Sequence, residues 1–213
     1  MRTLSGWAQA CDSVLLSCSG VLLGCCTALL MAGCGSAPLG GPPGLAGAEI
    51  AQTSGFTLAG RISVNYGTQN VSGKVQWTHE AARDDIALAS PLGTQVARLL
   101  RDGAGVTLTD SEQGVYRAAD AETLTQERLG WRLPLTGLAD WVRGRAHGSA
   151  PQALRRDEQG RIAYLDESGW RIEYAHAEDA PAAASLPRRL IMRYLRSAEP
   201  LEIRLVIDQW GAP

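Results

Sequence analysis

The chain has 213 residues, a formal net charge of −2 and 45% hydrophobic residues, which is ordinary for a globular protein. A near-neutral balance provides no long-range attraction to nucleic acid, so we expect no nucleic-acid partner. All five cysteines lie at or before Cys34. The remainder of the chain therefore cannot contain a disulfide framework, a cysteine metal site or a cysteine nucleophile.

The first 33 residues are predicted to be a lipoprotein signal peptide. Residues 21–31 are apolar and match the length of a signal-peptide core, but they are too short to span a bilayer, which needs about 20 residues. The sequence LLMAGC at residues 29–34 resembles a lipobox, so we expect cleavage before Cys34 and acylation of that cysteine. Residues 22–25 form a second candidate lipobox. An ordinary hydrophobic segment is the remaining alternative.

Residues 34–54 are rich in Gly, Pro and Ala and are predicted to be a flexible tether behind the acylated cysteine. From residue 55 apolar and polar residues alternate, beginning with Phe56, Leu58, Ile62 and Val64 on one face, which is typical of half-buried strands. Further strands are predicted at residues 71–77, 85–89, 95–101, 105–109, 114–118, 161–165, 170–174, 189–195 and 201–207. Residues 176–187 are Ala/Pro-rich and are predicted to form a mobile insertion between two of these strands.

Two short helices are predicted in the middle of the chain. Asp120 can cap a helix over residues 121–129, because its side chain can accept from exposed backbone N–H groups. A second helix is expected after Pro134 and should end near Gly144. Residues 55–213 are thus predicted to form one mostly β (α+β) domain, a curved antiparallel sheet or partly closed barrel of roughly ten short strands, with the helices over its open mouth.

A search for catalytic chemistry finds no candidate. The histidines, His79, His147 and His176, are far apart and share no metal-ligand spacing. The acidic pair Asp84 and Asp85 lies in a loop-like segment and is expected to be solvated. Motifs of serine hydrolases, zinc proteases and nucleotide-binding loops are missing from the sequence. We therefore expect a binding or carrier protein with no catalytic residue, metal or cofactor.

Several short motifs are spread along residues 56–210 of the sequence. These are FTLAGRISV at 56–64, SGKVQW at 72–77, LASPLG at 88–93, LGWRLPL at 129–135, LADWVRG at 138–144, GWRIEY at 169–174, LP at 186–187 and Trp210. Their order and spacing resemble the LolB family of outer-membrane lipoprotein receptors. The resemblance covers about residues 55–210, which is nearly all of the predicted domain.

The resemblance implies a half-open antiparallel β-barrel of about ten or eleven strands, with short helices covering an apolar cavity. Such a protein takes mature lipoproteins from the periplasmic carrier LolA and inserts them into the inner leaflet of the outer membrane. We expect a monomer that is lipid-anchored there and faces the periplasm. Gly35 follows the acylated cysteine, in place of the aspartate typical of inner-membrane retention. The resemblance also implies that Leu92 is an exposed residue used in membrane insertion. The alternative is a turn residue folded onto the core.

The inward apolar face is the candidate lining for acyl chains. It comprises Leu58, Ile62, Val64, Val75, Trp77, Ile86, Leu88, Val106, Leu108, Ile172, Ile203 and Leu205, with Leu135, Leu138 and Trp141 as a candidate helical lid. Alternation alone leaves open whether these residues line a cavity or fill a packed core. Two other functions also remain open: a periplasm-facing carrier or sensor of another lipid, and a structural envelope lipoprotein that binds no lipid.

Overall fold

The computed structural model describes residues 54–148, 150–177 and 185–213. All of them belong to one compact unit, Leu39–Pro213. The predicted signal peptide, Cys34 and the tether up to residue 53 lie outside the described residues. Most of the predicted insertion, residues 178–184, also lies outside them.

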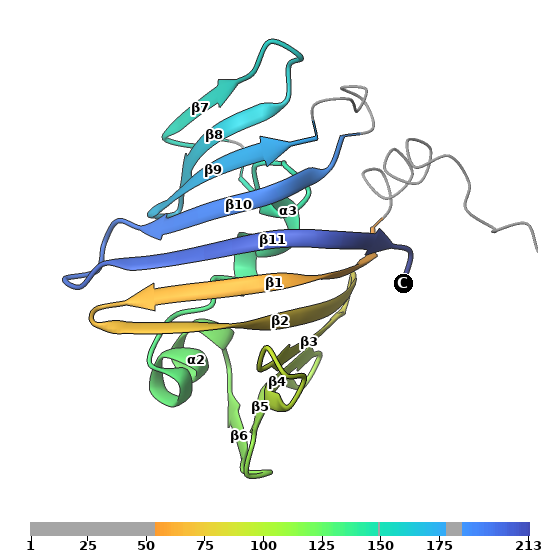
Figure 1. Cartoon of the computed structure of the whole chain (residues 1–213), viewed down its shortest axis with the longest axis vertical. Helices are drawn as coiled ribbons and strands as arrows, with labels where there is room; N and C mark the ends of the chain where they lie inside the picture. Colours follow the sequence, from red (N-terminus) through yellow and green to blue (C-terminus); the bar gives the residue numbers. More distant parts are fainter. Residues whose placement is uncertain (1–53, 149, 178–184) are drawn as a thin grey trace, which may run out of the picture. The chain divides into compact units, whose positions relative to one another are not determined.

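The fold is one antiparallel sheet of eleven strands in the order β6-β5-β4-β3-β2-β1-β11-β10-β9-β8-β7 (Figure 1). The strands are β1 (Phe56–Tyr66), β2 (Gln69–Glu80), β3 (Arg83–Ala89), β4 (Gln95–Asp102), β5 (Gly105–Asp110), β6 (Val115–Ala118), β7 (Ala153–Arg156), β8 (Ile162–Glu167), β9 (Trp170–His176), β10 (Pro187–Tyr194) and β11 (Leu201–Gly211). The two edge strands, β6 and β7, do not pair with each other in the described part of the chain. The predicted half-open, mostly β fold is therefore confirmed.

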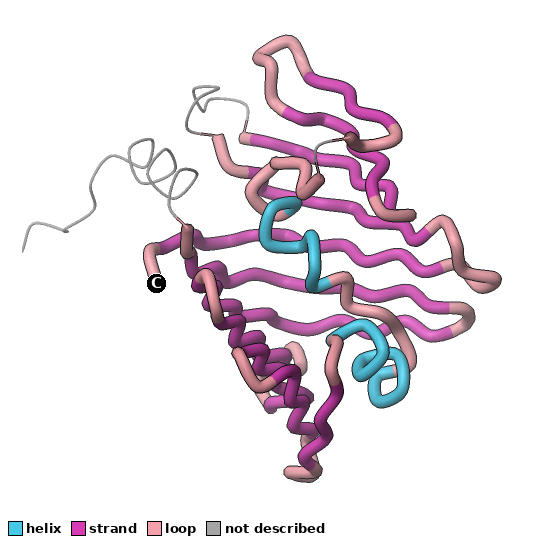
Figure 2. The backbone as a smooth tube through the Cα atoms, turned by 180° about the vertical axis from the view of Figure 1, so that it is seen from behind, coloured by secondary structure: helices cyan, strands magenta, loops and turns pink. Residues whose placement is uncertain are grey.

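The strand order explains where the helices lie. Strands β1 to β6 and β7 to β11 form two antiparallel meanders, and pairing of β1 with β11 joins them at the centre. The chain must therefore travel from one edge of the sheet to the other. It does so through α2 (Ala121–Leu129) and α3 (Leu135–Trp141), which lie on the same side of the sheet (Figure 2). No helix in the described part of the chain is long and apolar enough to cross a membrane.

The alternation in the sequence becomes an inward and an outward face. In β11, Leu201, Ile203, Leu205 and Ile207 are buried, and the residues between them are more exposed. A single core runs through the sheet and the helices, so a one-residue slip would turn a whole strand's apolar face to water. Gly73 of β2 lies where β3 approaches closely, and a side chain there would collide with the carbonyl oxygen of Ala89 on β3.

The first helix begins as predicted. Asp120 is the N-cap of α2, and its side chain accepts a 2.8 Å hydrogen bond from the amide of Thr123. Gly130 ends the helix with φ of 81°, a left-handed conformation that glycine adopts without strain. The second helix is shorter than predicted, because α3 ends at Trp141 and tighter turns carry the chain to Gly144.

Two expectations from the sequence were wrong. Residues 153–156 form edge strand β7, which no alternating apolar pattern had marked. Asp84 was expected to be solvated in a loop, yet it lies in β3 and is only 2% exposed. The hairpin register places it directly opposite His79 of β2 and Arg101 of β4, and these partners compensate for its burial.

Candidate functional site

An apolar cavity lies between the inward face of the sheet and the helical crossover. Its volume is about 30 Å³. The cavity is lined by Leu58, Ile62, Val75, Trp77, Ile86, Leu88, Leu133, Leu138, Met192, Ile203 and Leu205. The lining comes from β1, β2, β3, β10, β11, α3 and the loop before α3. Every lining side chain is hydrophobic, so the cavity can accept an apolar group.

Most of the predicted lining residues meet at this cavity. The exceptions are Val64, Leu108 and Ile172, which are buried in the continuous core but do not line the cavity, and Val106, which lines a neighbouring polar cleft. The three predicted lid residues lie in different surroundings. Leu138 of α3 lines the cavity, Leu135 lines the polar cleft, and Trp141 packs against Trp170 with ring centroids 6.5 Å apart. Leu133 and Met192 also line the cavity, although neither was among the predicted lining residues.

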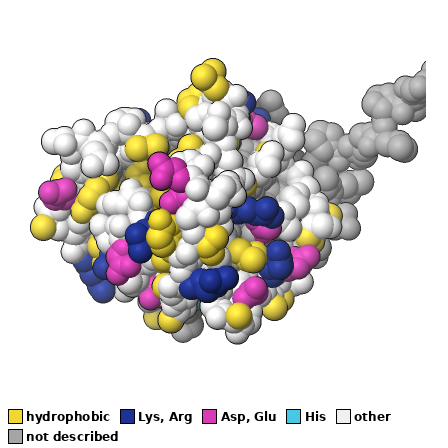
Figure 3. Space-filling view, turned by 90° about the horizontal axis from the view of Figure 1, so that it is seen from below, with side chains coloured by type: hydrophobic (Ala, Val, Ile, Leu, Met, Phe, Trp, Pro, Cys, Tyr) yellow, Lys and Arg dark blue, Asp and Glu magenta, His cyan; other side chains and the backbone are white. Residues whose placement is uncertain are grey.

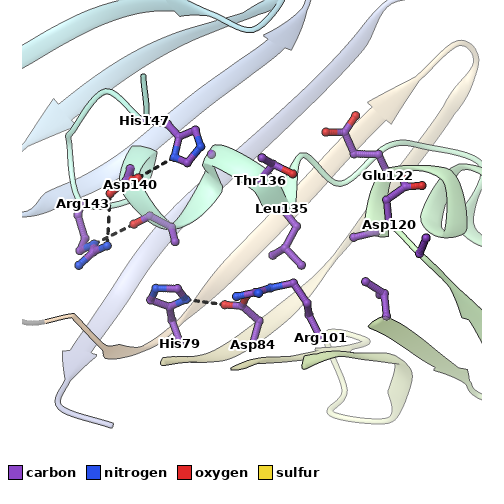
Figure 4. A pocket seen from close by; sticks show the side chains of 15 residues that line it. His79, Asp84, Arg101, Asp120, Glu122, Leu135, Thr136, Asp140, Arg143 and His147 are labelled. Carbon is purple, nitrogen blue, oxygen red and sulfur yellow. Dashed lines mark hydrogen bonds and ion pairs between the residues drawn. The ribbon is translucent and has the colours of Figure 1, made fainter. Parts of the chain in front are cut away.

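The polar cleft has a volume of about 400 Å³ and lies on the other side of α3. Its walls come from the ends of β2, β3 and β4, from the start of α2 and from α3 (Figure 4). Trp77 lies at the boundary between the two spaces. Its ring lines the cavity, while its Nε1–H donates a 2.9 Å hydrogen bond to Asp84, which lines the cleft.

Asp84 is the centre of a buried charge cluster in this cleft. It also contacts Nδ1 of His79 at 2.6 Å and accepts from Nε of Arg101 at 2.6 Å. Burial by itself raises the pKa of Asp84. The hydrogen bonds from His79, Trp77 and Arg101 outweigh burial and hold the pKa of this carboxyl below its ordinary value.

A second cluster forms where α3 ends. Asp140 accepts from Arg145 at 2.7 Å and contacts Nδ1 of His147 at 2.9 Å, and Arg143 lies 3.4 Å away (Figure 4). Burial raises the pKa of Asp140, but these contacts with His147 and the arginines outweigh it and lower the pKa. Arg143 is buried with its guanidinium 5.3 Å from the centre of the Phe56 ring. The clusters of Asp84 and Asp140 therefore face the same cleft from opposite walls.

Glu167 ties α3 and the segment after it to β8. This carboxylate is 5% exposed and accepts from Trp141 Nε1 at 2.6 Å, from the His147 amide at 2.9 Å and from the Gly148 amide at 2.6 Å. Burial raises the pKa of Glu167, and the three donors outweigh it and lower the pKa. This contact was not predicted from the sequence, because its two side chains are 26 residues apart. The only available signal was a carboxylate at the inward position of a strand.

Leu92 stands at the tip of the connection between β3 and β4. Its side chain is 96% exposed. A compact turn holds the tip, with Gly93 N donating to Ser90 O at 2.9 Å and Ser90 N to Thr94 O at 2.8 Å. Gly93 has φ of 95°, which an L-residue rarely adopts. The structure thus presents Leu92 to solvent and does not fold it onto the core.

The face drawn in Figure 3 shows no large patch of a single charge sign. On the face drawn in Figure 3, basic and acidic side chains are interspersed. Among the described residues, no group of three or more His, Cys, Asp or Glu side chains could hold a metal ion.

The fold and site define a class of protein in which a curved open sheet and a helical crossover enclose an apolar cavity. A family model described as outer membrane lipoprotein LolB matches residues 54–210. The chain therefore belongs to the LolB family.

The relatives include the outer-membrane lipoprotein LolB of Thiobacillus denitrificans, 38% identical over 169 residues, 79% of this chain and 87% of that protein. The outer-membrane lipoprotein LolB of Nitrosomonas europaea is 38% identical over 155 residues, 73% of this chain and 72% of that protein. Among solved structures, a DUF1329 family protein from Desulfovibrio piger is 9% identical with a TM-score of 0.48, covering 81% of this chain and 94% of that chain.

Proposed function

We propose that this protein accepts acylated lipoproteins from a LolA-type periplasmic carrier and inserts them into the inner leaflet of the outer membrane. The observation that carries the proposal is the apolar cavity beneath α3 in a chain of the LolB family. In this proposal Cys34 is acylated after removal of residues 1–33, residues 34–54 are the tether, and the monomeric domain faces the periplasm. The description of the family names an outer-membrane lipoprotein and no catalytic activity.

The energetics of acyl chains require such a site. A triacylated lipoprotein carries roughly 40 methylene groups, and exposing each to water costs about 0.8 kcal/mol, on the order of 30 kcal/mol in total. Release of the free lipoprotein into the periplasm is therefore negligible. Transfer needs a continuous apolar path from the carrier to the receptor and on to the bilayer. It needs no nucleotide if each site binds the chains somewhat more tightly than the site before it.

The cavity must enlarge to serve this path. Its volume of about 30 Å³ is far below the roughly 300–1,000 Å³ of sites that hold small ligands. A long acyl chain cannot enter such a space. Leu133 and Leu138 come from the helical crossover, whereas the other lining residues come from strands that a hydrogen-bonded ladder holds in place. We therefore propose that α3 and the loop before it move away from the sheet when the chains enter.

Leu92 is proposed to enter the bilayer during delivery. A fully exposed leucine on a tightly turned tip has no role in the core, and burying it in hydrocarbon gains about 2 kcal/mol. Because the tip is held by short backbone hydrogen bonds, the insertion loses little conformational entropy. Leu92 thus gives the domain a weak, reversible membrane contact in addition to the proposed lipid anchor.

The proposal is tested by following a triacylated lipoprotein from its purified LolA carrier to an unacylated protein comprising residues 35–213, and then to liposomes. We expect the wild type to take the cargo and pass it on. Leu92→Glu should take the cargo and fail to pass it on, because a carboxylate at the tip opposes membrane entry. Val115→Glu is the matched control, because Val115 is also exposed (51%) but lies on edge strand β6.

The outcomes separate the competing functions. If no cargo reaches the wild-type protein, the receptor proposal is wrong. Extraction and identification of bound lipid would then distinguish a carrier or sensor of another lipid from a structural lipoprotein with no lipid. If Val115→Glu blocks delivery as strongly as Leu92→Glu, the specific role of Leu92 is wrong.

A further inference from the structure

We propose that the polar cleft beside α3 binds the peptide segment that directly follows the acylated cysteine of a client lipoprotein. This inference rests on the proposed function, because it requires the client's acyl chains to occupy the neighbouring apolar cavity. It assigns a second subsite, with a different chemistry, to the same bound molecule.

The apolar cavity and the polar cleft lie next to each other. The cavity and the cleft share α3 as a common wall, since Leu138 lines the cavity and Leu135 and Thr136 line the cleft. Trp77 and Asp84 form a second shared wall through their 2.9 Å hydrogen bond. An amphiphile whose apolar chains lie under α3 would therefore bring its polar part to the cleft, which opens to solvent beside the helix. Figure 4 shows Leu135 and Thr136 of α3 with Asp140 and His147 on one side of them and Asp120 and Glu122 on the other.

The cleft has the size of a ligand site, and its charged groups are preorganised. Its volume of about 400 Å³ is within the range of small-ligand sites, roughly 300–1,000 Å³. Its charged groups are fixed before any ligand arrives. Asp84 is 2% exposed and held by three donors, and Arg101 directs Nε and one terminal nitrogen toward it. Burying charges costs free energy unless they are paired, and these groups are paired in a geometry that still leaves Arg101 partly exposed to the cleft.

The charges of the cleft lining favour a peptide over a phospholipid head group. The carboxylates of the lining are Asp84, Asp120, Glu122 and Asp140, and its guanidiniums are those of Arg101 and Arg143. The other titratable groups that face the cleft are His79 and His147. Both guanidiniums already pair with carboxylates of the cleft, Arg101 with Asp84 and Arg143 with Asp140, so a phosphate would have to displace a carboxylate to reach either one. Backbone N–H groups and basic side chains of a peptide would meet acceptors. The cleft should therefore prefer a neutral or basic segment to an acidic one.

The test uses a photoreactive lipopeptide and the full chain, produced with its own leader and reconstituted in liposomes. The probe is tripalmitoyl-Cys-Ser-Lys-Lys-Lys-Lys with a diazirine either in place of the serine side chain or at the end of one acyl chain. We expect the peptide-positioned diazirine to label the rim of the cleft around Glu122 and Thr136. The chain-positioned diazirine should label the cavity wall around Leu138 and Met192. Labelled residues are identified by mass spectrometry of peptides.

A charge-reversing substitution then tests whether the cleft prefers a basic peptide to an acidic one. Glu122 is partly exposed and its ion pair with Arg132 is 3.4 Å long, so Glu122→Lys should leave the fold intact. This variant should lower peptide-positioned labelling by the tetralysine probe roughly fivefold, and it should raise labelling by the matching tetraglutamate probe. Glu158→Lys carries the same charge change on the exposed turn between β7 and β8, and it should alter neither. Thr136→Lys, at an exposed position of α3, is a second variant with the same expected direction.

The outcomes keep this inference separate from the proposed function. Chain-positioned labelling of the cavity with peptide-positioned labelling away from the cleft would overturn the inference and leave the receptor function standing. Labelling by neither probe would overturn both. If phosphatidylglycerol with a head-group diazirine labels the cleft more strongly than the lipopeptide does, the cleft is a phospholipid site and the inference is wrong.

Discussion

Replacing Glu167 by glutamine tests whether α3 is held to the sheet by one buried carboxylate. Oε2 of Glu167 accepts from Trp141 Nε1 and the His147 amide, and Oε1 accepts from the Gly148 amide. A glutamine oxygen in place of Oε2 would keep the first two contacts, but its amide N–H₂ would face the Gly148 N–H. A charge-assisted hydrogen bond contributes about 1.5–3 kcal/mol, so we expect Glu167→Gln to lower the free energy of unfolding by about 2–3 kcal/mol at pH 7.

The assay is urea unfolding followed by tryptophan fluorescence, together with amide hydrogen exchange at His147 and Gly148. With a denaturant slope of about 2 kcal/mol per molar urea, the midpoint should fall by roughly 1 M. Exchange at the two amides should accelerate, because the segment after α3 loses its anchor. Glu158→Gln, at an exposed turn position, is the control and should leave both readouts unchanged.

The effect of Glu167→Gln should depend on pH in a defined direction. The pKa of Glu167 is below its ordinary value in the folded state, because the three donors outweigh burial. Its stabilisation is therefore complete above the unfolded-state pKa of about 4.3 and is lost as the pH falls through the lower folded-state pKa. The difference between wild type and variant should shrink below about pH 4. A midpoint within about 0.2 M of wild type at pH 7, or a difference that does not shrink in acid, would refute the reasoning.

Three further substitutions test the cavity, the cleft and the sheet. Leu138→Ala should lower the free energy of unfolding by about 2–4 kcal/mol and enlarge the cavity. A fluorescent fatty acid should therefore bind to this variant at least as tightly as to the wild type. Weaker binding with an intact fold would contradict the assignment of Leu138 to the cavity lining. Asp84→Asn removes the buried counterion of Arg101 and should lower the free energy of unfolding by about 3 kcal/mol at pH 7, measured by urea unfolding. An unchanged free energy of unfolding would show that the charges of this cluster are not paired as described. Gly73→Val should lower Tm by several degrees, because the new valine side chain would meet a carbonyl oxygen of β3. Gly103→Val, in an open turn, is the control and should leave Tm unchanged. Equal changes in Tm would contradict the close approach of β2 and β3 at Gly73.

The sequence alone was sufficient for the features that depend on neighbouring residues. Strand faces follow from the two-residue period, as in β11, where the alternation of Leu201, Ile203 and Leu205 became burial. The cap of α2 depends on Asp120 and Thr123, which are three residues apart, so a local pattern could identify it. The ordered motifs also pointed to the LolB family, which the comparisons confirmed.

The tertiary structure decided which inward residues face empty space and which are packed. Leu58 and Leu108 have the same place in the alternation, but only Leu58 lines the cavity, because the residues opposite them come from different parts of the chain. Close packing depends on those distant neighbours, and a strand period carries no information about them. The burial of Asp84 and the contact of Glu167 with Trp141, 26 residues away in sequence, arise in the same way. Each depends on the sheet register and on the path of the chain across its face, and neither exists until the sheet has formed.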